Sequence, residues 1–185
     1  MKFVIDASSL LAFVRYYLPF DKTGKLKAEL QARIEDKEII VIDKVRDESK
    51  YTAKKAIYLA LEVLHEKKNT QNTDLVLPDP KFFKMLDNNF TVQSQKKQLE
   101  PEQYEALKAK FLSGADCKMI LLCYVRMKGK DSEDYVIITE ETDSQNDGKL
   151  FKKIPLICKE LRIECISIAD FIKRYSSMLF RIEEE

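Results

Sequence analysis

The chain has 185 residues, 45% of them hydrophobic and 34% charged, a balance that predicts one well-cored domain and excludes a disordered chain. Its 32 basic residues nearly cancel its 31 acidic residues, so a nucleic-acid partner would have to meet a local basic surface. No apolar run approaches the roughly 20 residues of a membrane helix, and the N-terminus carries no signal-peptide pattern, so we expect a cytoplasmic protein that does not associate with membranes.

The first third of the chain predicts two strand–helix units. Residues 3–5 form an apolar, β-branched run that ends on Asp6, and apolar residues recur at helical spacing from residue 10 to residue 18. We expect a second helix at residues 26–34 and a second strand at residues 39–42. Asp43 is expected to cap a long helix whose buried stripe extends to residue 64.

The middle of the chain is more polar and predicts helices without strands. Residues 66–73 predict a loop, a short helix is expected around residues 82–86, and Pro101 opens a helix that extends to about residue 112. Gly114 breaks the pattern, and a very apolar helix is expected from residue 115 to about residue 127. We interpret residues 67–105 as a helical insertion.

The last third returns to alternating strands and helices. Strands are expected at residues 135–138 and 163–168, a helix starts at Pro155, and a last helix carries an apolar face up to residue 179. This alternation predicts an α/β fold, with a central parallel sheet of four or five strands between two helical layers. We expect a single domain over residues 1–182 and a frayed tail at residues 183–185.

The four cysteines lie in apolar segments and form no CxxC pair. This pattern predicts buried free thiols in a reducing compartment and argues against disulfides or a zinc site. The residues are Cys117, Cys123, Cys158 and Cys165.

Four acidic residues share one expected place in this fold. Asp6 and Glu141 follow strands, whereas Glu48 and Asp116 lie near helix starts. Strand carboxyl ends and helix amino ends face the same edge of such a sheet, so folding is expected to bring the four carboxylates together. Their repulsion favours a divalent cation, and their hard oxygen ligands suit Mg²⁺ or Mn²⁺, which could activate a water against a phosphodiester.

Each acid alone also has a simpler explanation. Asp116 could favour a helix N-terminus through the helix dipole, Glu48 could be a solvated helix acid, and Glu140 and Glu141 could be exposed loop acids. Asp6 is harder to explain in this way, because an acid that directly ends a buried strand loses its hydration unless it is partnered. The prediction of a site therefore depends on the edge that the four acids share.

The same stretches carry a resemblance to the PIN (PilT N-terminus) domain family, which includes the toxins of many bacterial and archaeal toxin–antitoxin pairs. The matching segments are Val4-Ile-Asp-Ala-Ser-Ser-Leu10, Val45-Arg-Asp-Glu48, Gly114-Ala-Asp-Cys-Lys-Met-Ile120 and Ile137-Ile-Thr-Glu-Glu141. The segment Lys153-Ile-Pro-Leu-Ile-Cys158 is similar to a PIN subgroup with a lysine–isoleucine–proline signature. No single motif is specific, but their order and spacing together are, and they span nearly the whole chain.

This resemblance implies a PIN-like fold and metal-dependent endonuclease activity, usually on RNA. The catalytic residues and ligands of Mg²⁺ or Mn²⁺ would be Asp6, Glu48, Asp116 and Glu141, with Ser8 and Thr139 supporting them through their hydroxyls. One departure is Glu141, where many relatives carry aspartate. Glu141 is preferred over Glu140 because the family pattern places the acid two residues after the threonine.

Candidate substrate-binding residues lie near the second acid and in the insertion, where cations and aromatic rings could meet RNA. The cations near the second acid are Lys44, Arg46 and Lys50, and the insertion adds Lys81, Phe82, Phe83 and Lys84. Lysines on solvated helix faces are common, and the two phenylalanines could instead belong to the core. The only histidine, His65, is far in sequence from the acids and is not expected to act as a general base.

Two functions from different classes are open. The first is a metal-dependent endoribonuclease, as the toxin of a toxin–antitoxin pair with an antitoxin protein as partner. The second is a non-catalytic PIN scaffold that binds a protein or a nucleic acid. A phosphatase of the haloacid dehalogenase type would need an aspartate where Ser8 stands. The resemblance also implies a homodimer, whereas RNA or DNA as target and one or two ions stay open.

Overall fold

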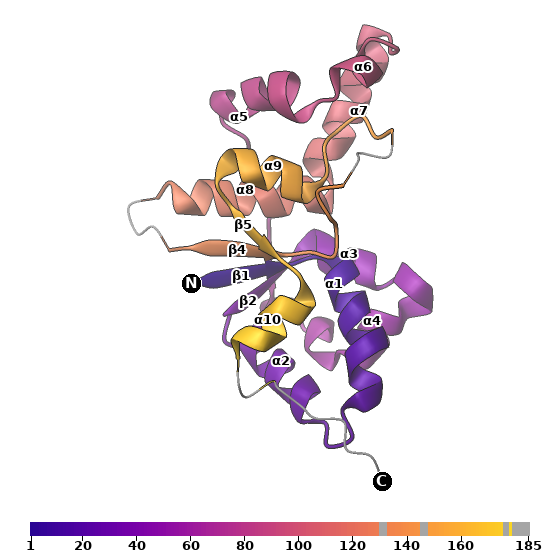
Figure 1. The fold of residues 1–185 in the computed structure, drawn as a ribbon, viewed down its shortest axis with the longest axis vertical. Helices are drawn as coiled ribbons and strands as arrows, with labels where there is room; N and C mark the ends of the chain where they lie inside the picture. Colours follow the sequence, from indigo (N-terminus) through magenta and orange to yellow (C-terminus); the bar gives the residue numbers. More distant parts are fainter. Residues whose placement is uncertain (130–132, 145–147, 176–177, 179–185) are drawn as a thin grey trace.

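A parallel sheet runs through the middle of the molecule, and helices cover both of its faces (Figure 1). The computed structural model describes residues 1–129, 133–144, 148–175 and 178. Within these residues the sheet has five strands in the order β3-β2-β1-β4-β5, and every neighbouring pair is parallel. The strands are β1 (Lys2–Ile5), β2 (Ile39–Ile42), β3 (Thr70–Gln71), β4 (Tyr135–Ile138) and β5 (Glu164–Ile166).

Two helical layers enclose this sheet. The helices are α1 (Ala7–Ala12), α2 (Lys25–Glu35), α3 (Asp43–Ser49), α4 (Ala56–Ala60), α5 (Pro80–Met85), α6 (Gln93–Lys96), α7 (Pro101–Ser113), α8 (Ala115–Met127), α9 (Ile154–Leu161) and α10 (Ile168–Arg174). In Figure 1, α8 and α9 lie on one side of the sheet, and α1, α2, α4 and α10 lie on the other. The predicted three-layer α/β/α architecture with a parallel sheet is therefore confirmed.

The central strand β1 explains why the N-terminal apolar run has no polar alternation. Its residues pair with β2 on one side and with β4 on the other, so that Val4 lies beside both Ile40 and Ile137. Helices cover both faces, and strands buried on both faces are continuously apolar. Phe3 packs edge-on against Phe171 of α10, with the ring centroids 4.9 Å apart, and this contact joins the last helix to the sheet.

The predicted long helix after β2 is wrong. Helix α3 ends at Ser49, and three consecutive residues, Ala53, Lys54 and Lys55, have φ values of 48°, 57° and 66° before α4 begins. A left-handed backbone at three non-glycine residues cannot continue a right-handed helix. Asp43 is also not the N-cap, which is Ile42; its carboxylate instead accepts a hydrogen bond of 2.6 Å from the Thr73 hydroxyl.

The insertion at residues 67–105 begins with a strand, which corrects the prediction of helices alone. β3 pairs with Val41 and Ile42 of β2 at the edge of the sheet, inside the segment predicted as a loop. A strand of two polar residues is too short to show the alternation of apolar and polar side chains that indicates a strand in a sequence. The other predicted helices and strands have their expected places within a few residues, except that the last helix ends at Arg174, before the predicted apolar face up to residue 179 is complete. Residue 179 and the tail at residues 183–185 lie outside the described residues.

The insertion is joined to the loop after β4, and this contact shapes the region beside the predicted site. Thr91 and Phe151 form an antiparallel bridge, the Val92 amide donates to the Leu150 carbonyl at 2.8 Å, and the Lys152 amide donates to the Phe90 carbonyl at 2.8 Å. In Figure 1, α5, α6 and α7 extend beyond α8 and α9. The chain from α5 to α7 therefore lies close to the carboxyl end of β4.

The cysteines are free, as expected: Cys117, Cys123 and Cys158 are buried and Cys165 is partly buried. Burial raises the pKa of the Cys117 thiol to about 12, so this residue is a protonated core side chain. Across the described ranges, no helix combines the length and the apolar character that crossing a membrane requires.

Candidate functional site

Asp6 stands at the point where the central strand becomes the first helix. Its amide continues the ladder by donating to Ile138 of β4 at 3.1 Å, and its side chain caps α1 by accepting from the Ser9 amide at 2.6 Å. The hydroxyls of Ser8 and Thr139 donate to its second carboxylate oxygen at 2.7 and 2.6 Å. With 5% of its surface exposed, Asp6 depends on these donors to replace lost hydration.

Ser8 and Thr139 also link Asp6 to the turn that follows β4. The Thr139 hydroxyl accepts from the Glu141 amide at 3.1 Å, and the Ser8 hydroxyl accepts from the Glu140 amide at 3.4 Å. Each hydroxyl thus touches both Asp6 and the backbone of residues 139–141. The two residues predicted to support the acids lie where they can fix a carboxylate in position.

Glu48 and Asp116 approach Asp6 from two other elements, α3 and the first turn of α8. Burial raises the pKa of Asp116 to about 6, and the carboxylates of Glu141 and Asp6 add to this shift. Burial likewise raises the pKa of Glu48, with added contributions from Asp116 and Asp6. Both side chains still reach solvent at the surface of the site. Each of the four predicted acids therefore lies within the electric field of at least one other.

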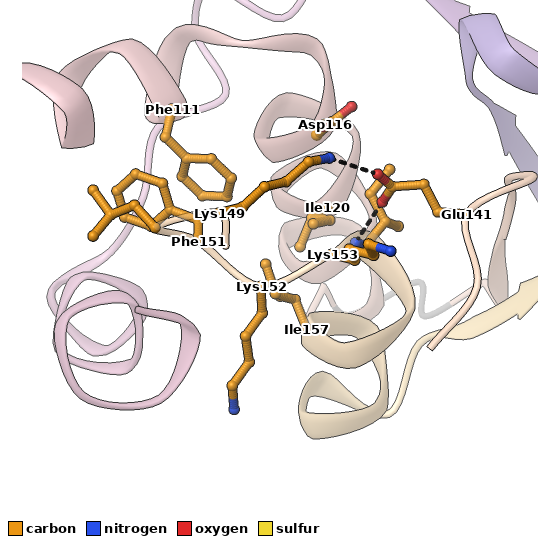
Figure 2. Close-up of a pocket in the computed structure, with 11 residues that line it drawn as sticks. Phe111, Asp116, Ile120, Glu141, Lys149, Phe151, Lys152, Lys153 and Ile157 are labelled. Carbon is orange, nitrogen blue, oxygen red and sulfur yellow. Dashed lines mark hydrogen bonds and ion pairs between the residues drawn. The ribbon is translucent and has the colours of Figure 1, made fainter. Parts of the chain in front are cut away.

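Glu141 and Glu140 have different structural roles at the end of β4. The Glu141 carboxylate accepts from the Ile154 amide at the start of α9 at 2.9 Å and pairs with Lys149 at 3.4 Å (Figure 2). Glu140 instead accepts from the Ile168 amide at the start of α10 at 2.9 Å. Since Glu141, and not Glu140, raises the pKa of Asp116, Glu141 is the acid of this pair that faces the cluster.

The carboxylates share a space without closing around it. Among the residues that the structure describes, no three acidic, histidine or cysteine side chains lie close enough together to hold a metal ion. Lys149 also lowers the pKa of Asp116 slightly against the larger opposite effects. The donor set nevertheless fits Mg²⁺ or Mn²⁺ chemically, because all four candidate ligands are carboxylates, and after burial the neighbouring carboxylates are the next cause that raises the pKa of Glu48 and of Asp116.

The three predicted substrate cations near the second acid are bound to nearby protein groups, whereas Lys81 and Lys84 of the insertion are exposed. Arg46 is 8% exposed and donates to the carbonyls of Leu64 and His65 at 2.7 and 3.1 Å, so it holds the chain after α4 instead of facing a substrate. Lys50 pairs with Asp47 at 2.6 Å, and Lys44 lies 3.3 Å from Asp74 and 3.4 Å from Asp43. In the insertion, Phe82 is buried and Phe83 is 38% exposed. His65 contacts the Tyr58 carbonyl at 2.8 Å.

Residues beside Asp116 that the sequence did not single out line two recesses of about 150 and 310 Å³. They come from α7 and from the loop before α9, and the smaller recess is shown in Figure 2. The residues are Leu107, Lys110, Phe111, Lys149, Leu150 and Phe151. One sequence signal was present, since residues 149–153 interleave three lysines with a phenylalanine, a pattern that favours nucleic-acid contact.

Comparison with known proteins places residues 3–179 in one family. No curated protein and no solved structure matches the chain. A family model matches residues 3–179, which include all four acids, both hydroxyls and the loop before α9. The chain therefore belongs to the family described as domain of unknown function (DUF4411).

Proposed function

We propose that this protein is a metal-dependent endoribonuclease whose site lies at the carboxyl edge of β1 and β4. One observation carries the proposal: Asp6, 5% exposed at the end of β1, is held by the hydroxyls of Ser8 and Thr139, and Thr139 joins it to the turn that carries Glu141. Asp116 lies close enough for both carboxylates to raise its pKa, in addition to the larger effect of burial. A concentration of negative charge on three separate elements costs folding free energy. Such a cost is expected where the charge has a function, and a divalent cation removes it.

The four acids would divide the work of holding the ion. Asp6, fixed by three donors, supplies a ligand whose position is set before the ion arrives. Within the described ranges no hydrogen-bond donor restrains the carboxylate of Glu48 or of Asp116, and Glu141 would exchange its contact with Lys149. When bound, Mg²⁺ or Mn²⁺ supplies positive charge that polarises a phosphodiester and acidifies a water. Lys149 would then be placed to neutralise a substrate phosphate.

The resemblance to PIN domains extends this proposal to RNA as substrate and to a toxin with an antitoxin protein as its partner. It also supports a homodimer. These extensions come from the resemblance of the sequence motifs, and the arrangement of Asp6, Ser8, Thr139 and Glu141 at one edge agrees with it. The membrane plays no part in the proposal.

A second function is supported by a different observation. Lys149 lies 3.4 Å from Glu141, and in the described part of the chain no three potential ligands are within reach of one ion. A protein in which this ammonium is the lasting counter-charge would be a non-catalytic scaffold that binds a protein or a nucleic acid. This alternative predicts partner binding without any effect of Mn²⁺.

Cleavage of single-stranded RNA with and without Mn²⁺ separates the two functions, run beside the variant Asp6→Asn. Asparagine can still accept from the Ser9 amide, and the hydroxyls of Ser8 and Thr139 can reorient, so the variant is expected to fold. We expect Mn²⁺-stimulated cleavage to fall at least about a hundredfold.

The matched control is Asp47→Asn, because Asp47 lies on the same edge but is neutralised by Lys50. It should retain activity within about twofold. Undiminished cleavage by Asp6→Asn would remove Asp6 from the site. Absence of cleavage in the unmodified protein at every Mn²⁺ concentration would favour the scaffold.

A further inference from the structure

Two recesses adjoin beside Asp116, and Glu48, Asp116 and Glu141 lie in their walls. The smaller, of about 150 Å³, has Glu141 and Lys149 in its wall, and the larger, of about 310 Å³, has Glu48 and Lys110. Both are lined by Phe111, Asp116, Leu150 and Phe151. These four shared residues place the two recesses side by side along the acids, and we refer to them together as the groove. The larger recess alone, at about 310 Å³, reaches the range of small-ligand sites, roughly 300–1,000 Å³.

The apolar part of this groove is aromatic and fixed. Phe111 of α7 and Phe151 stack with ring centroids 4.3 Å apart and planes inclined by 22°. In Figure 2 the two rings lie together on one side of the recess, with the Glu141 carboxylate on the other. Leu107, one turn earlier on α7, is 40% exposed at the rim. A flat ring entering the groove would meet aromatic and aliphatic surface that is already in place.

The insertion holds this aromatic surface against the acids. Phe151 forms a bridge with Thr91, and the flanking amide hydrogen bonds join residues 90–92 to residues 150–152. Asp116 follows α7 by three residues, so the helix that carries Phe111 also leads directly into the helix that carries the acid. The distance between rings and acid is therefore set by two rigid helices and one backbone bridge.

Two lysines lie at the margin of the groove. Lys110 is exposed on α7, and the Lys149 side chain is 57% exposed, so both ammonium groups reach solvent near the rings. Carboxylates lie in both recesses, Asp116 in each, Glu141 in the smaller and Glu48 in the larger, and the smaller recess also has Lys152 and Lys153 in its lining. An apolar floor with cations at its margin is complementary to a group that is flat and uncharged in one part and anionic in the other, which describes a nucleotide.

We infer that this groove, defined by Leu107, Lys110, Phe111, Lys149 and Phe151, holds an unpaired base of a single-stranded RNA substrate. The inference rests on the proposed function, because it places the phosphodiester next to this base beside Asp116 and the other acids of the proposed site. The base adds to the stacked pair of phenylalanines, and the lysines neutralise flanking phosphates. A paired base already has both faces covered by its neighbours in the duplex, so double-stranded RNA cannot fill the groove.

Binding of RNA to the full chain tests this without catalysis. The probe is a single-stranded RNA of about ten nucleotides with one 2-aminopurine, measured at low salt with EDTA so that no metal-dependent cleavage takes place. Its fluorescence is expected to fall on binding, because the base stacks on an aromatic ring. In Phe111→Leu and Phe151→Leu, which keep the apolar volume, we expect about five- to tenfold weaker binding and loss of the quenching.

Lys110→Gln provides a second test that does not touch the aromatic packing. We expect about threefold weaker binding and a slope of log Kd against log salt that is smaller by about 0.7, the value for one phosphate contact on a single strand. Matched controls are Phe20→Leu, which replaces another exposed aromatic ring, and Lys25→Gln at the start of α2, far from α7 in Figure 1. Neither control should change RNA affinity, and thermal unfolding checks that each variant is folded.

The outcomes are distinct from those of the cleavage assay. Unchanged affinity and quenching in both phenylalanine variants would overturn the base site and leave a protein segment as occupant of the groove. Equal affinity for single-stranded and duplex RNA would overturn it as well. If RNA binds through the groove while the protein cleaves nothing, the base site stands and the nuclease falls. If Asp6→Asn loses cleavage while the groove variants bind RNA normally, the nuclease stands and the base site falls.

Discussion

Asp47 and Glu48 are neighbours on α3, yet their surroundings shift the two pKa values in opposite directions. The Lys50 ammonium, 2.6 Å from Asp47, holds the pKa of that carboxyl below its usual range through a hydrogen bond. Glu48 faces the other way, where burial and then the carboxylates of Asp116 and Asp6 raise its pKa. We call Asp43, Asp47 and Asp74 the outer acids of this edge, and each of them has a lysine partner. We call Asp6, Glu48, Asp116 and Glu141 the inner acids, whose negative charge is not balanced by nearby cations.

The outer acids continue the balanced pattern at the neighbouring strand. Hydrogen bonds from Asn72 and then Lys44 lower the pKa of Asp74, and Lys44 also lies 3.4 Å from Asp43. In the described ranges no ion pair reaches the carboxylate of Glu48. The number of acids therefore does not mark the site. The difference lies in the balance: each outer acid has a lysine within 3.4 Å, whereas the described residues place a single ion pair, Lys149 with Glu141, among the inner acids.

The most direct test of this difference is to remove one inner acid and one outer acid in separate variants. We expect Glu48→Gln to lower Mn²⁺-stimulated RNA cleavage on the order of a hundredfold, because a ligand to the ion is lost. Asp47→Asn, one residue away, should change cleavage by less than about twofold. Initial rates under saturating Mn²⁺ measure both. Equal losses in the two variants would mean that the charge balance does not distinguish a functional acid from a structural one.

Metal binding should stabilise the protein through the inner acids only. At an ion concentration near a hundred times Kd the gain is about 2.7 kcal/mol, which corresponds to a rise in Tm on the order of 5 °C for a chain of this size. Asp116→Asn should lose most of this rise, whereas Asp47→Asn should keep it. Thermal unfolding with Mn²⁺ and with EDTA gives the comparison. A Tm that does not respond to millimolar Mn²⁺ would argue against a metal site.

The fold could be predicted from the sequence where elements are buried on both faces. β1, β2 and β4 are continuous apolar runs between helical layers, so their composition alone identifies them. β3 could not be found, because two polar residues at an edge show no period and are specified by pairing with β2. The break after α3 has no local signal either, since residues 53–55 are Ala, Lys and Lys rather than glycine.

The sequence was sufficient to predict at which edge of the sheet the candidate site lies, but not the contacts within it. The strand–helix order was sufficient to place Asp6 and Glu141 at one end of the sheet, because parallel topology fixes that end. Three facts depend on long-range contacts that no periodicity reports. They are the burial of Arg46 under two carbonyls, the approach of Lys149 to Glu141 and the bridge that sets Phe151 beside Asp116.

The raised pKa of Asp116 predicts how metal-free stability depends on pH. Its value is about 6 in the folded protein against an ordinary 3.8, so the folded state binds more protons than the unfolded state between these values. Stability from this group is therefore present at low pH and is lost as pH rises from about 4 through 6. Denaturant unfolding in EDTA at a series of pH values measures this window.

Asp116→Asn isolates that contribution. At about pH 7 without metal the variant should be more stable than the unmodified protein by on the order of 1 kcal/mol, a figure reduced because the side chain reaches solvent and is screened. At about pH 4 the difference should vanish, because the unmodified carboxyl is then protonated in the folded state. A variant that is less stable at both pH values would show that Asp116 serves α8 more than it repels its neighbours.

The smallest expected effect concerns Lys149, which pairs with the inner acid Glu141 at 3.4 Å. Lys149→Gln should change stability by less than about 0.5 kcal/mol, because the lysine of its ion pair with Glu141 is 57% exposed and the pair is screened by solvent. The pKa of Asp116 should rise further, since Lys149 lowers it. Mn²⁺ should bind about fivefold more tightly, the equivalent of about 1 kcal/mol between charges near 4 Å in water.

Lys173→Gln is the matched control for this last change, because it removes an exposed ion pair of 3.3 Å with Asp170 on α10. It should leave Mn²⁺ affinity unchanged. If Lys149→Gln weakens Mn²⁺ binding instead, the ammonium supports the acids rather than competing with the ion. The inner acids would then be balanced in the same way as the outer ones, and the scaffold function would gain support over the nuclease.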